Sequence, residues 1–252
     1  MEELHIDFCF IDTNIIIDAI LNLSDYRIMK FFRDIENNKI NCYITKTVKE
    51  ESEVKIEETL NYFGNVLKEY SEKSLLYIFE QEGLNEDSTI TTRSILLLEK
   101  FFNTIYAQRN VLKGPVRILE DMLIKFIEAK LQSNIDITIK LIIERLISEL
   151  LKFSVSLRNK YDDFFIRPYV IVLDEDPDQR IIDDIRDKIR RFPKDDAKHL
   201  SIIYQYFLKI NKNMIFVTRD NGILKYRDEL LEHFNIICSD PLYAIYHCLH
   251  GY

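Results

Sequence analysis

Short apolar runs alternate with amphipathic stretches at both ends of this chain. The runs that predict strands cover 5–11, 40–45, 169–173, 214–218 and 235–238, because a strand buried on both faces of a parallel sheet is a short, continuous apolar run. Strands that alternate with helices at this spacing are typical of a parallel sheet with right-handed crossovers. We therefore predict an α/β fold with a central parallel sheet of about five strands flanked by helices.

Helical spacing fills the gaps between the predicted strands. The segment 28–35 repeats apolar residues at three- and four-residue intervals, as does the buried face of a helix. Ser24 or Asp25 would cap this helix, and Asn37 or Asn38 would adopt the left-handed conformation that ends it. Further helices are predicted over 15–21, from Thr47, from Pro177 to Arg191, over 194–208 and 223–233, and from Pro241.

The middle of the chain has a different pattern, with long helical repeats and no convincing strand. Breaks at 114–115 and 134–136 separate predicted helices over 92–111 and 137–157. We predict an all-helical insertion over 56–167, rich in Ile and Leu, whose apolar faces must pack on something. A homodimer interface, a clamp over a substrate and an enlarged core are all compatible with this pattern.

The predicted organisation is therefore one α/β domain, made of residues 1–55 and 168–252, that is interrupted by the helical insertion 56–167. A hydrophobic content of 47%, with five Gly and five Pro, favours a compact globular protein over a disordered one. No apolar run approaches the roughly 20 residues that span a bilayer, and the amino terminus lacks the pattern of a secretory signal. A cytoplasmic protein without a membrane segment is expected.

The spacing of the cysteines and the net charge limit the kinds of binding site that the chain can contain. The cysteines Cys9, Cys42, Cys238 and Cys248 show no C-x-x-C spacing, so buried free thiols are favoured over zinc ligands or disulfides. A net charge of −8 argues against nucleic-acid binding through overall charge. A local basic run nevertheless lies within 186–198, where it forms either a substrate contact or a solvated helix face.

Four carboxylates stand at strand ends or helix starts in the α/β portion. Asp12 ends the first strand, Glu51 follows the second, Asp196 opens a helix in KDDAKHL, and Asp220 follows a strand in IFVTRDNG. Ligands of open α/β sheets bind at the carboxyl ends of the strands. Crowded carboxylates repel one another, and a divalent cation removes that repulsion. Hydrolysis of a phosphodiester by one or two Mg²⁺ or Mn²⁺ ions would use such a set.

These positions also carry a family pattern. The chain resembles the PIN-domain nucleases in an apolar strand that ends in D-T-N at 12–14, a Glu six residues after the strand-ending Thr45, a D-A pair at 196–197, and a T-x-D at 218–220. The resemblance covers roughly residues 4–55 and 169–250 and leaves the insertion unexplained. A second acidic residue often follows the last motif in that family, whereas Asn221 and Gly222 stand there in this chain.

The resemblance implies a PIN-like fold and an endoribonuclease that cuts single-stranded RNA to 5′-phosphate and 3′-hydroxyl ends. It implies Mg²⁺ or Mn²⁺ bound by Asp12, Asp196 and Asp220, with Glu51 as a further ligand or a water-orienting base. Asn14 and Thr218 would orient groups in the site. The candidates for substrate phosphate contacts are Lys194, Lys198 and Arg219. The implied partners are RNA and an antitoxin-type protein, and roles as a toxin, in RNA processing or in RNA decay all fit.

Ordinary structural roles compete with this interpretation for each residue taken singly. Asp12 could cap a helix, Asp196 could complement a helix dipole, and Asp220 could belong to a turn. Thr47 and Glu50 form a capping-box pattern, which favours Glu51 as the site residue. The scattered histidines favour a surface role for His199.

Two alternative functions also remain open. An aspartyl-nucleophile phosphatase also ends its first strand on Asp, but it needs an acid two residues later, where this chain has Asn14. The other alternative is a non-catalytic PIN-like module that binds RNA or protein.

Overall fold

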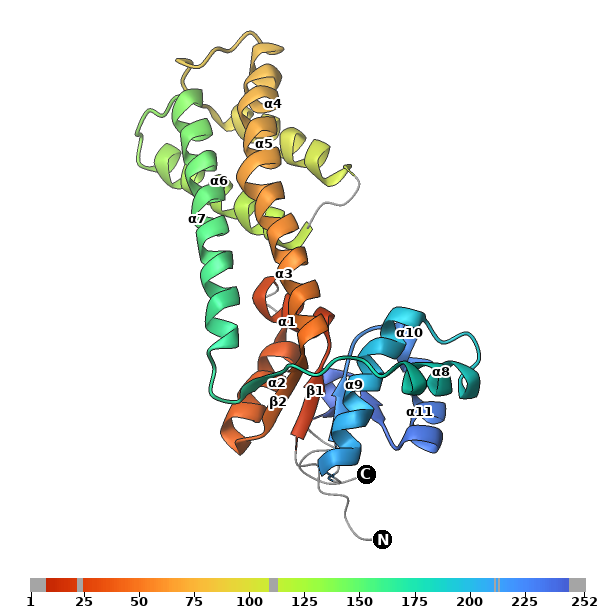
Figure 1. Ribbon diagram of the computed structural model, residues 1–252. Helices are drawn as coiled ribbons and strands as arrows, with labels where there is room; N and C mark the ends of the chain where they lie inside the picture. Colours follow the sequence, from red (N-terminus) through yellow and green to blue (C-terminus); the bar gives the residue numbers. More distant parts are fainter. Residues whose placement is uncertain (1–7, 22–24, 109–112, 211, 213, 245–252) are drawn as a thin grey trace. The chain divides into compact units, whose positions relative to one another are not determined.

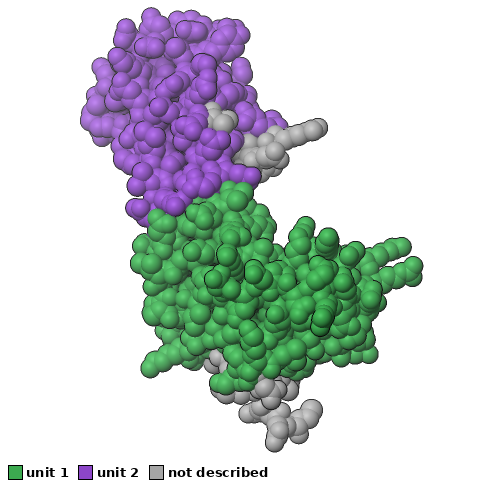
Figure 2. Space-filling view, viewed as in Figure 1, with its two compact units in different colours: residues 1–56, 160–252 green, residues 57–159 purple. Residues whose placement is uncertain are grey.

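The computed structural model describes residues 8–21, 25–108, 113–210, 212 and 214–244. The chain forms two compact units, which Figure 2 distinguishes by colour. Unit 1 comprises Met1–Ile56 and Lys160–Tyr252, and unit 2 comprises Glu57–Asn159. Both boundaries fall inside long helices, α3 (Lys46–Asn61) and α7 (Ile139–Phe165). The chain therefore leaves and re-enters unit 1 through continuous helix rather than through a loop.

A five-stranded parallel sheet forms the centre of unit 1 (Figure 1). Its strands are β1 (Phe8–Ile11), β2 (Asn41–Thr45), β3 (Val170–Leu173), β4 (Met214–Val217) and β5 (Ile237–Ser239). They lie in the order β3-β2-β1-β4-β5, and every neighbouring pair is parallel. The prediction of an α/β fold with a central parallel sheet flanked by helices is confirmed.

The strand order creates one special position in the sheet. From β1 the chain moves outward to β2 and β3, and it then returns to the other side of β1 to form β4 and β5. Between β1 and β4 the crossovers lead away in opposite directions, which opens a crevice at the carboxyl ends of these two strands. Asp12 directly follows β1, and Thr218 directly follows β4.

The strands β1, β4 and β5 are buried on both faces, whereas β2 and β3 each include an exposed residue. Helices flank this sheet. They are α1 (Thr13–Leu21), α2 (Tyr26–Asn38), α8 (Gln179–Lys188), α9 (Lys194–Ile210), α10 (Asn221–Leu224) and α11 (Arg227–Phe234), with the adjoining ends of α3 and α7. Phe8, Phe10 and Phe216 belong to one apolar cluster with α8 and α9. The neighbouring residues Cys9 and Ile11 are equally buried. Burial on both faces explains why the strand sequences are continuous apolar runs rather than alternating ones.

The described part of unit 2 consists of helices joined by turns, with an isolated bridge between Thr89 and Thr138. It contains a π-helical turn, η1 (Tyr62–Leu67), and helices α4 (Lys68–Glu80), α5 (Thr92–Tyr106) and α6 (Lys113–Gln132), with most of α3 and α7. Phe63, Phe79, Leu98 and Phe101 lie in its own apolar core. The apolar load of this segment is thus used, in large part, inside the unit.

Several predicted helix boundaries differ from the observed ones, and three of these differences have an identifiable reason. Lys39, and not Asn37 or Asn38, takes the left-handed conformation after α2, and the Ile40 N–H bonds the Ile35 carbonyl as in a Schellman end. The helix predicted over 137–157 continues to Phe165 because Tyr161 and Phe164 extend the buried stripe.

The third correction concerns the helix predicted over 223–233. It is two helices, α10 and α11, separated by Lys225 and Tyr226. The Tyr226 ring packs on Phe192, and its hydroxyl donates to the Arg191 carbonyl at 3.4 Å. This contact with the α8–α9 connection occupies the break between the two helices.

Some predictions extend outside the described residues, namely those for 5–7, Ser24, the end of the predicted helix at 109–111, Cys248 and the helix beyond 244. Residues 241–244 are helical. Cys9, Cys42 and Cys238 are buried free thiols. Among the helices that the structure describes, none has the length and apolar character needed to cross a membrane.

Candidate active site

Asp12 is held firmly at the crevice between β1 and β4. Its N–H bonds the Val217 carbonyl at 3.0 Å, which continues the β1–β4 ladder by one residue. Its carboxylate is buried: Oδ1 accepts from the Thr13 N–H at 2.7 Å, and Oδ2 accepts from the Thr218 hydroxyl at 2.6 Å. Burial raises the pKa of Asp12, and the hydrogen bonds from Thr218 and Thr13 offset part of this effect. Oδ1 thus accepts from the first residue of α1, and Oδ2 accepts from the residue that follows β4.

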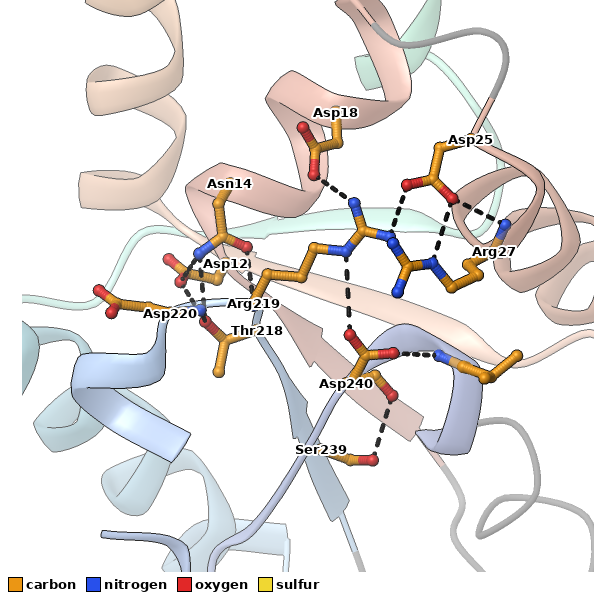
Figure 3. A network of polar contacts seen from close by, with 11 residues as sticks. Asp12, Asn14, Asp18, Asp25, Arg27, Thr218, Arg219, Asp220, Ser239 and Asp240 are labelled. Carbon is orange, nitrogen blue, oxygen red and sulfur yellow. Dashed lines mark hydrogen bonds and ion pairs between the residues drawn. The ribbon is translucent and has the colours of Figure 1, made fainter. Parts of the chain in front are cut away.

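Asn14 and Thr218 hold this carboxylate from two elements (Figure 3). The Asn14 Nδ2 donates to Asp12 Oδ2 at 2.6 Å and lies 3.2 Å from the Thr218 hydroxyl, while the Arg219 N–H donates to Asn14 Oδ1 at 3.0 Å. Partners at both ends of the amide fix its orientation. The Asp220 N–H in turn donates to the Thr218 hydroxyl at 3.0 Å. These contacts tie the start of α1 to the chain that leaves β4.

Glu51 reaches the same region from α3. The Thr45 hydroxyl accepts from the Val48 N–H at 3.3 Å, so Thr45 caps the helix and the predicted Thr47–Glu50 capping box is wrong, because the helix begins earlier, at Lys46. Glu51 Oε2 accepts from the Thr13 hydroxyl at 2.8 Å, and Oε1 pairs with Lys55 at 2.7 Å. Burial alone would raise the pKa of Glu51, but the bonds from Lys55 and Thr13 lower it.

Asp196 lies in the first turn of α9, and its carboxylate has no hydrogen-bond donor in the described part of the chain. Burial raises the pKa of Asp196 to about 6, with further contributions from the charges of Asp220 and Asp12 and smaller ones from Asp195 and Glu51. The four predicted carboxylates therefore share one electrostatic environment. Asp196 carries most of the resulting cost of ionisation.

Asp220 is the exposed member of the group. It caps the short helix α10, where its Oδ1 accepts from the Gly222 N–H at 2.6 Å. A Cβ on residue 222 would lie only 2.9 Å from that oxygen, so glycine permits the close approach. The predicted turn role of Asp220 is thus real, and it leaves the second carboxylate oxygen available.

His199 enters the site, contrary to the surface role that its sequence context favoured. It follows Asp196 by three residues on α9, and its side chain is only 13% exposed. Its Nε2 lies 3.8 Å from Glu51 Oε2, which is too far for a hydrogen bond. Its Nδ1 is buried, and no partner exists for it among the described residues. Burial lowers the pKa of His199, although the charges of Asp12 and Glu51 act in the opposite direction.

Arg219 is bound within the chain rather than directed to solvent. Its guanidinium pairs with Asp18 at 2.7 Å and with Asp25 at 2.8 Å, and its Nε lies 3.9 Å from Asp240 (Figure 3). Asp25 also caps α2. The Arg219 side chain therefore links α1, the start of α2 and the residue after β5. Sequence reasoning missed this cluster, although Asp25 was already a candidate cap.

The two lysines that were predicted to contact phosphate lie on the first turns of α9. Lys194 is exposed, and Lys198 pairs with the exposed Asp195 at 2.7 Å. Such a solvent-exposed ion pair contributes little to stability, typically below about 1 kcal/mol. Lys198 can therefore change partners at low cost.

The chemistry of this donor set suits a divalent cation. Carboxylate oxygens are the ligands that Mg²⁺ and Mn²⁺ prefer, and the raised pKa of Asp196 and the partnerless Nδ1 of His199 both indicate unsatisfied polar groups. Within the described residues, no three His, Cys, Asp or Glu side chains are yet arranged to ligate one ion. Binding would require side-chain rotation, for which the partly exposed Glu51, Asp196 and Asp220 have room.

Comparisons with protein-family models, with curated proteins and with solved structures find no match to this chain. The geometry of the site is therefore the main basis for assigning a function.

We predict that Asp196→Asn stabilises the metal-free protein in a pH-dependent way. A folded-state pKa raised from 3.8 to about 6 gives stability that is present below pH 4 and lost as the pH rises through about 6. The amide cannot ionise, so at pH 7 the variant should be more stable by roughly 1 kcal/mol after allowance for solvent screening. Urea unfolding in EDTA between pH 4 and pH 8 measures this difference. Asp195→Asn is the neighbouring control, and a pH-independent difference would contradict the account.

We also predict that the Arg219 cluster supports the fold. Arg219→Met leaves three partly buried carboxylates without their common cation, and it should lower the free energy of unfolding by roughly 2 kcal/mol. The control is Arg27→Met, because among the described residues Arg27 pairs only with Asp25 and its side chain is 53% exposed, so the change should stay within about 0.5 kcal/mol. Equal effects of the two substitutions in urea unfolding would refute this role.

Proposed function

We propose that the protein is a PIN-like, metal-dependent endoribonuclease that hydrolyses single-stranded RNA to 5′-phosphate and 3′-hydroxyl ends. One observation supports the proposal: at the switch point of a parallel sheet, the charges of Asp12, Glu51 and Asp220, which come from three other segments, all act to raise the pKa of Asp196. Asp12 and Asp220 are 208 residues apart in the sequence, and the charges of both raise the pKa of Asp196. Such an arrangement is unfavourable for a purely structural role.

Each carboxylate has a distinct part in the proposed chemistry. Asp12, Asp196 and Asp220 would hold one or two Mg²⁺ or Mn²⁺ ions, with Glu51 as a further ligand or as an acceptor that orients water. A bound ion lowers the pKa of its water and stabilises the leaving oxygen. The Thr13 hydroxyl and Lys55 favour the ionised form of Glu51, since they lower its pKa. Asn14 and Thr218 fix Asp12 and thereby set the geometry of the site.

The proposed substrate contacts lie on and before α9. Lys194 and Lys198 precede or follow Asp196 by two residues, and Arg190 and Arg191 in the preceding connection are exposed. Lys and Arg supply most contacts to nucleic-acid phosphates. Arg219 is left out of this set because Asp18, Asp25 and Asp240 already engage its guanidinium. The resemblance to PIN nucleases supports RNA as the substrate.

The phosphatase alternative is disfavoured by the position of Asn14. The acid that such an enzyme needs would stand there, but the amide of Asn14 is occupied by Asp12 and the Arg219 N–H. A homodimer through unit 2 and an antitoxin-type partner stay predictions. A non-catalytic binding module is an outcome that the following experiment recognises.

We predict cleavage of single-stranded RNA that requires Mg²⁺ or Mn²⁺ and that falls at least about 100-fold in Asp12→Asn and Asp196→Asn. Asp195→Asn is the matched control, because this exposed neighbour pairs with Lys198, and it should keep most of the activity. Gel analysis of end-labelled RNA and a ligation assay for 5′-phosphate ends would measure the products. Intact RNA across a broad substrate panel, together with no metal binding by calorimetry, would overturn the enzyme proposal and favour a binding module.

A further inference from the structure

His199 is the group in the site whose surroundings remain unexplained by the proposed carboxylate chemistry. Its imidazole is only 13% exposed, yet neither ring nitrogen has a hydrogen bond within the part of the chain that the structure describes. A buried polar atom without a partner costs about 1 to 3 kcal/mol. The fully buried atom without a partner is Nδ1, whereas Nε2 faces Glu51 Oε2 across 3.8 Å, a gap that a hydrogen bond does not bridge. The gap at Nε2 is the place where a missing partner, such as an ion or a water molecule, would lie.

The position of His199 follows from the register of α9. Residues three apart lie on the same side of a helix, so His199 is one turn from Asp196 on a shared face. Ala197 and Leu200 are fully buried and anchor this turn in the core. The imidazole is consequently held against Glu51, with little freedom to turn to solvent.

We propose that His199 is a nitrogen ligand of the divalent ion and that it makes the site prefer a transition-metal ion such as Mn²⁺ over Mg²⁺. This inference rests on the proposed function, which supplies the ion. The 3.8 Å between His199 Nε2 and Glu51 Oε2 is longer than a hydrogen bond. It is within the span of two ligands that each lie about 2.1 Å from a common ion.

The preference for metal follows from the mixed donor set. Carboxylate oxygens are suitable ligands for both Mg²⁺ and Mn²⁺. Imidazole nitrogen, in contrast, is a good ligand for first-row transition metals and a poor one for Mg²⁺. Adding His199 to Asp12, Glu51 and Asp196 therefore shifts selectivity without adding charge. A histidine that only fills space would affect stability but would leave the metal preference unchanged.

Pulsed electron paramagnetic resonance of the full-length protein loaded with Mn²⁺ tests this directly, because a coordinated nitrogen modulates the electron spin echo. We expect nitrogen modulation in the wild type, its loss in His199→Gln and its retention in His233→Gln, since His233 is exposed on α11. Calorimetry should show Mn²⁺ affinity falling by about 10- to 100-fold in His199→Gln, with less than about threefold change for Mg²⁺.

The outcomes separate this inference from the proposed function. Mn²⁺ bound without nitrogen modulation, or modulation that persists in His199→Gln, overturns the ligand assignment and leaves the carboxylate site standing. Absence of both Mn²⁺ and Mg²⁺ binding to the wild type overturns both. If His199→Gln fails to fold, the wild type labelled with ¹⁵N-histidine gives the answer, because the modulation must change from the ¹⁴N to the ¹⁵N pattern if a histidine is bound.

Discussion

Unit 1 depends on the burial of one carboxylate. Asp12 is only 9% exposed at the end of β1, and a buried carboxylate is tolerated only when hydrogen-bond donors surround it. Those donors come from α1 and from the end of β4, so satisfying Asp12 also fixes how the two strands join. The requirement explains why Asn and Thr stand at 14 and 218, where each side chain donates to Asp12. The Thr13 hydroxyl donates instead to Glu51.

Two acidic clusters lie near this point, and they differ in how their charge is balanced. Asp18, Asp25 and Asp240 surround the guanidinium of Arg219, which offsets part of their charge from within the chain. Asp12 and Asp196 have no lysine or arginine partner in the described structure. The pKa of Asp196 is raised, as expected for a carboxylate that has no cationic partner. The first cluster contains its own cation, Arg219. The second has no such partner within the described residues, and an external cation would supply the missing positive charge.

The sheet was predictable in large part because β1, β4 and β5 are buried on both faces and are therefore continuous apolar runs, and the residues that follow these runs were predictable for the same reason. The Arg219 cluster was not, because Asp18 and Arg219 are 201 residues apart and no spacing rule connects them. His199 was misjudged because its sequence shows only the distance to Asp196, and the facing Glu51 comes from another helix. Asn is preferred in the left-handed conformation at helix ends, but here Lys39 adopts it, and the Ile40 N–H then bonds the Ile35 carbonyl.

If the proposed function is correct, a divalent cation completes the carboxylate cluster at the end of β1. Crystals soaked with Mn²⁺ test this claim most directly, because the ion scatters anomalously and can be located without assumptions about its ligands. We predict an anomalous peak within ligand distance, about 2.2 Å, of carboxylate oxygens of Asp12, Asp196 and Asp220. A saturating soak that leaves this position without a peak, in crystals where the three side chains are ordered and accessible, would contradict the account.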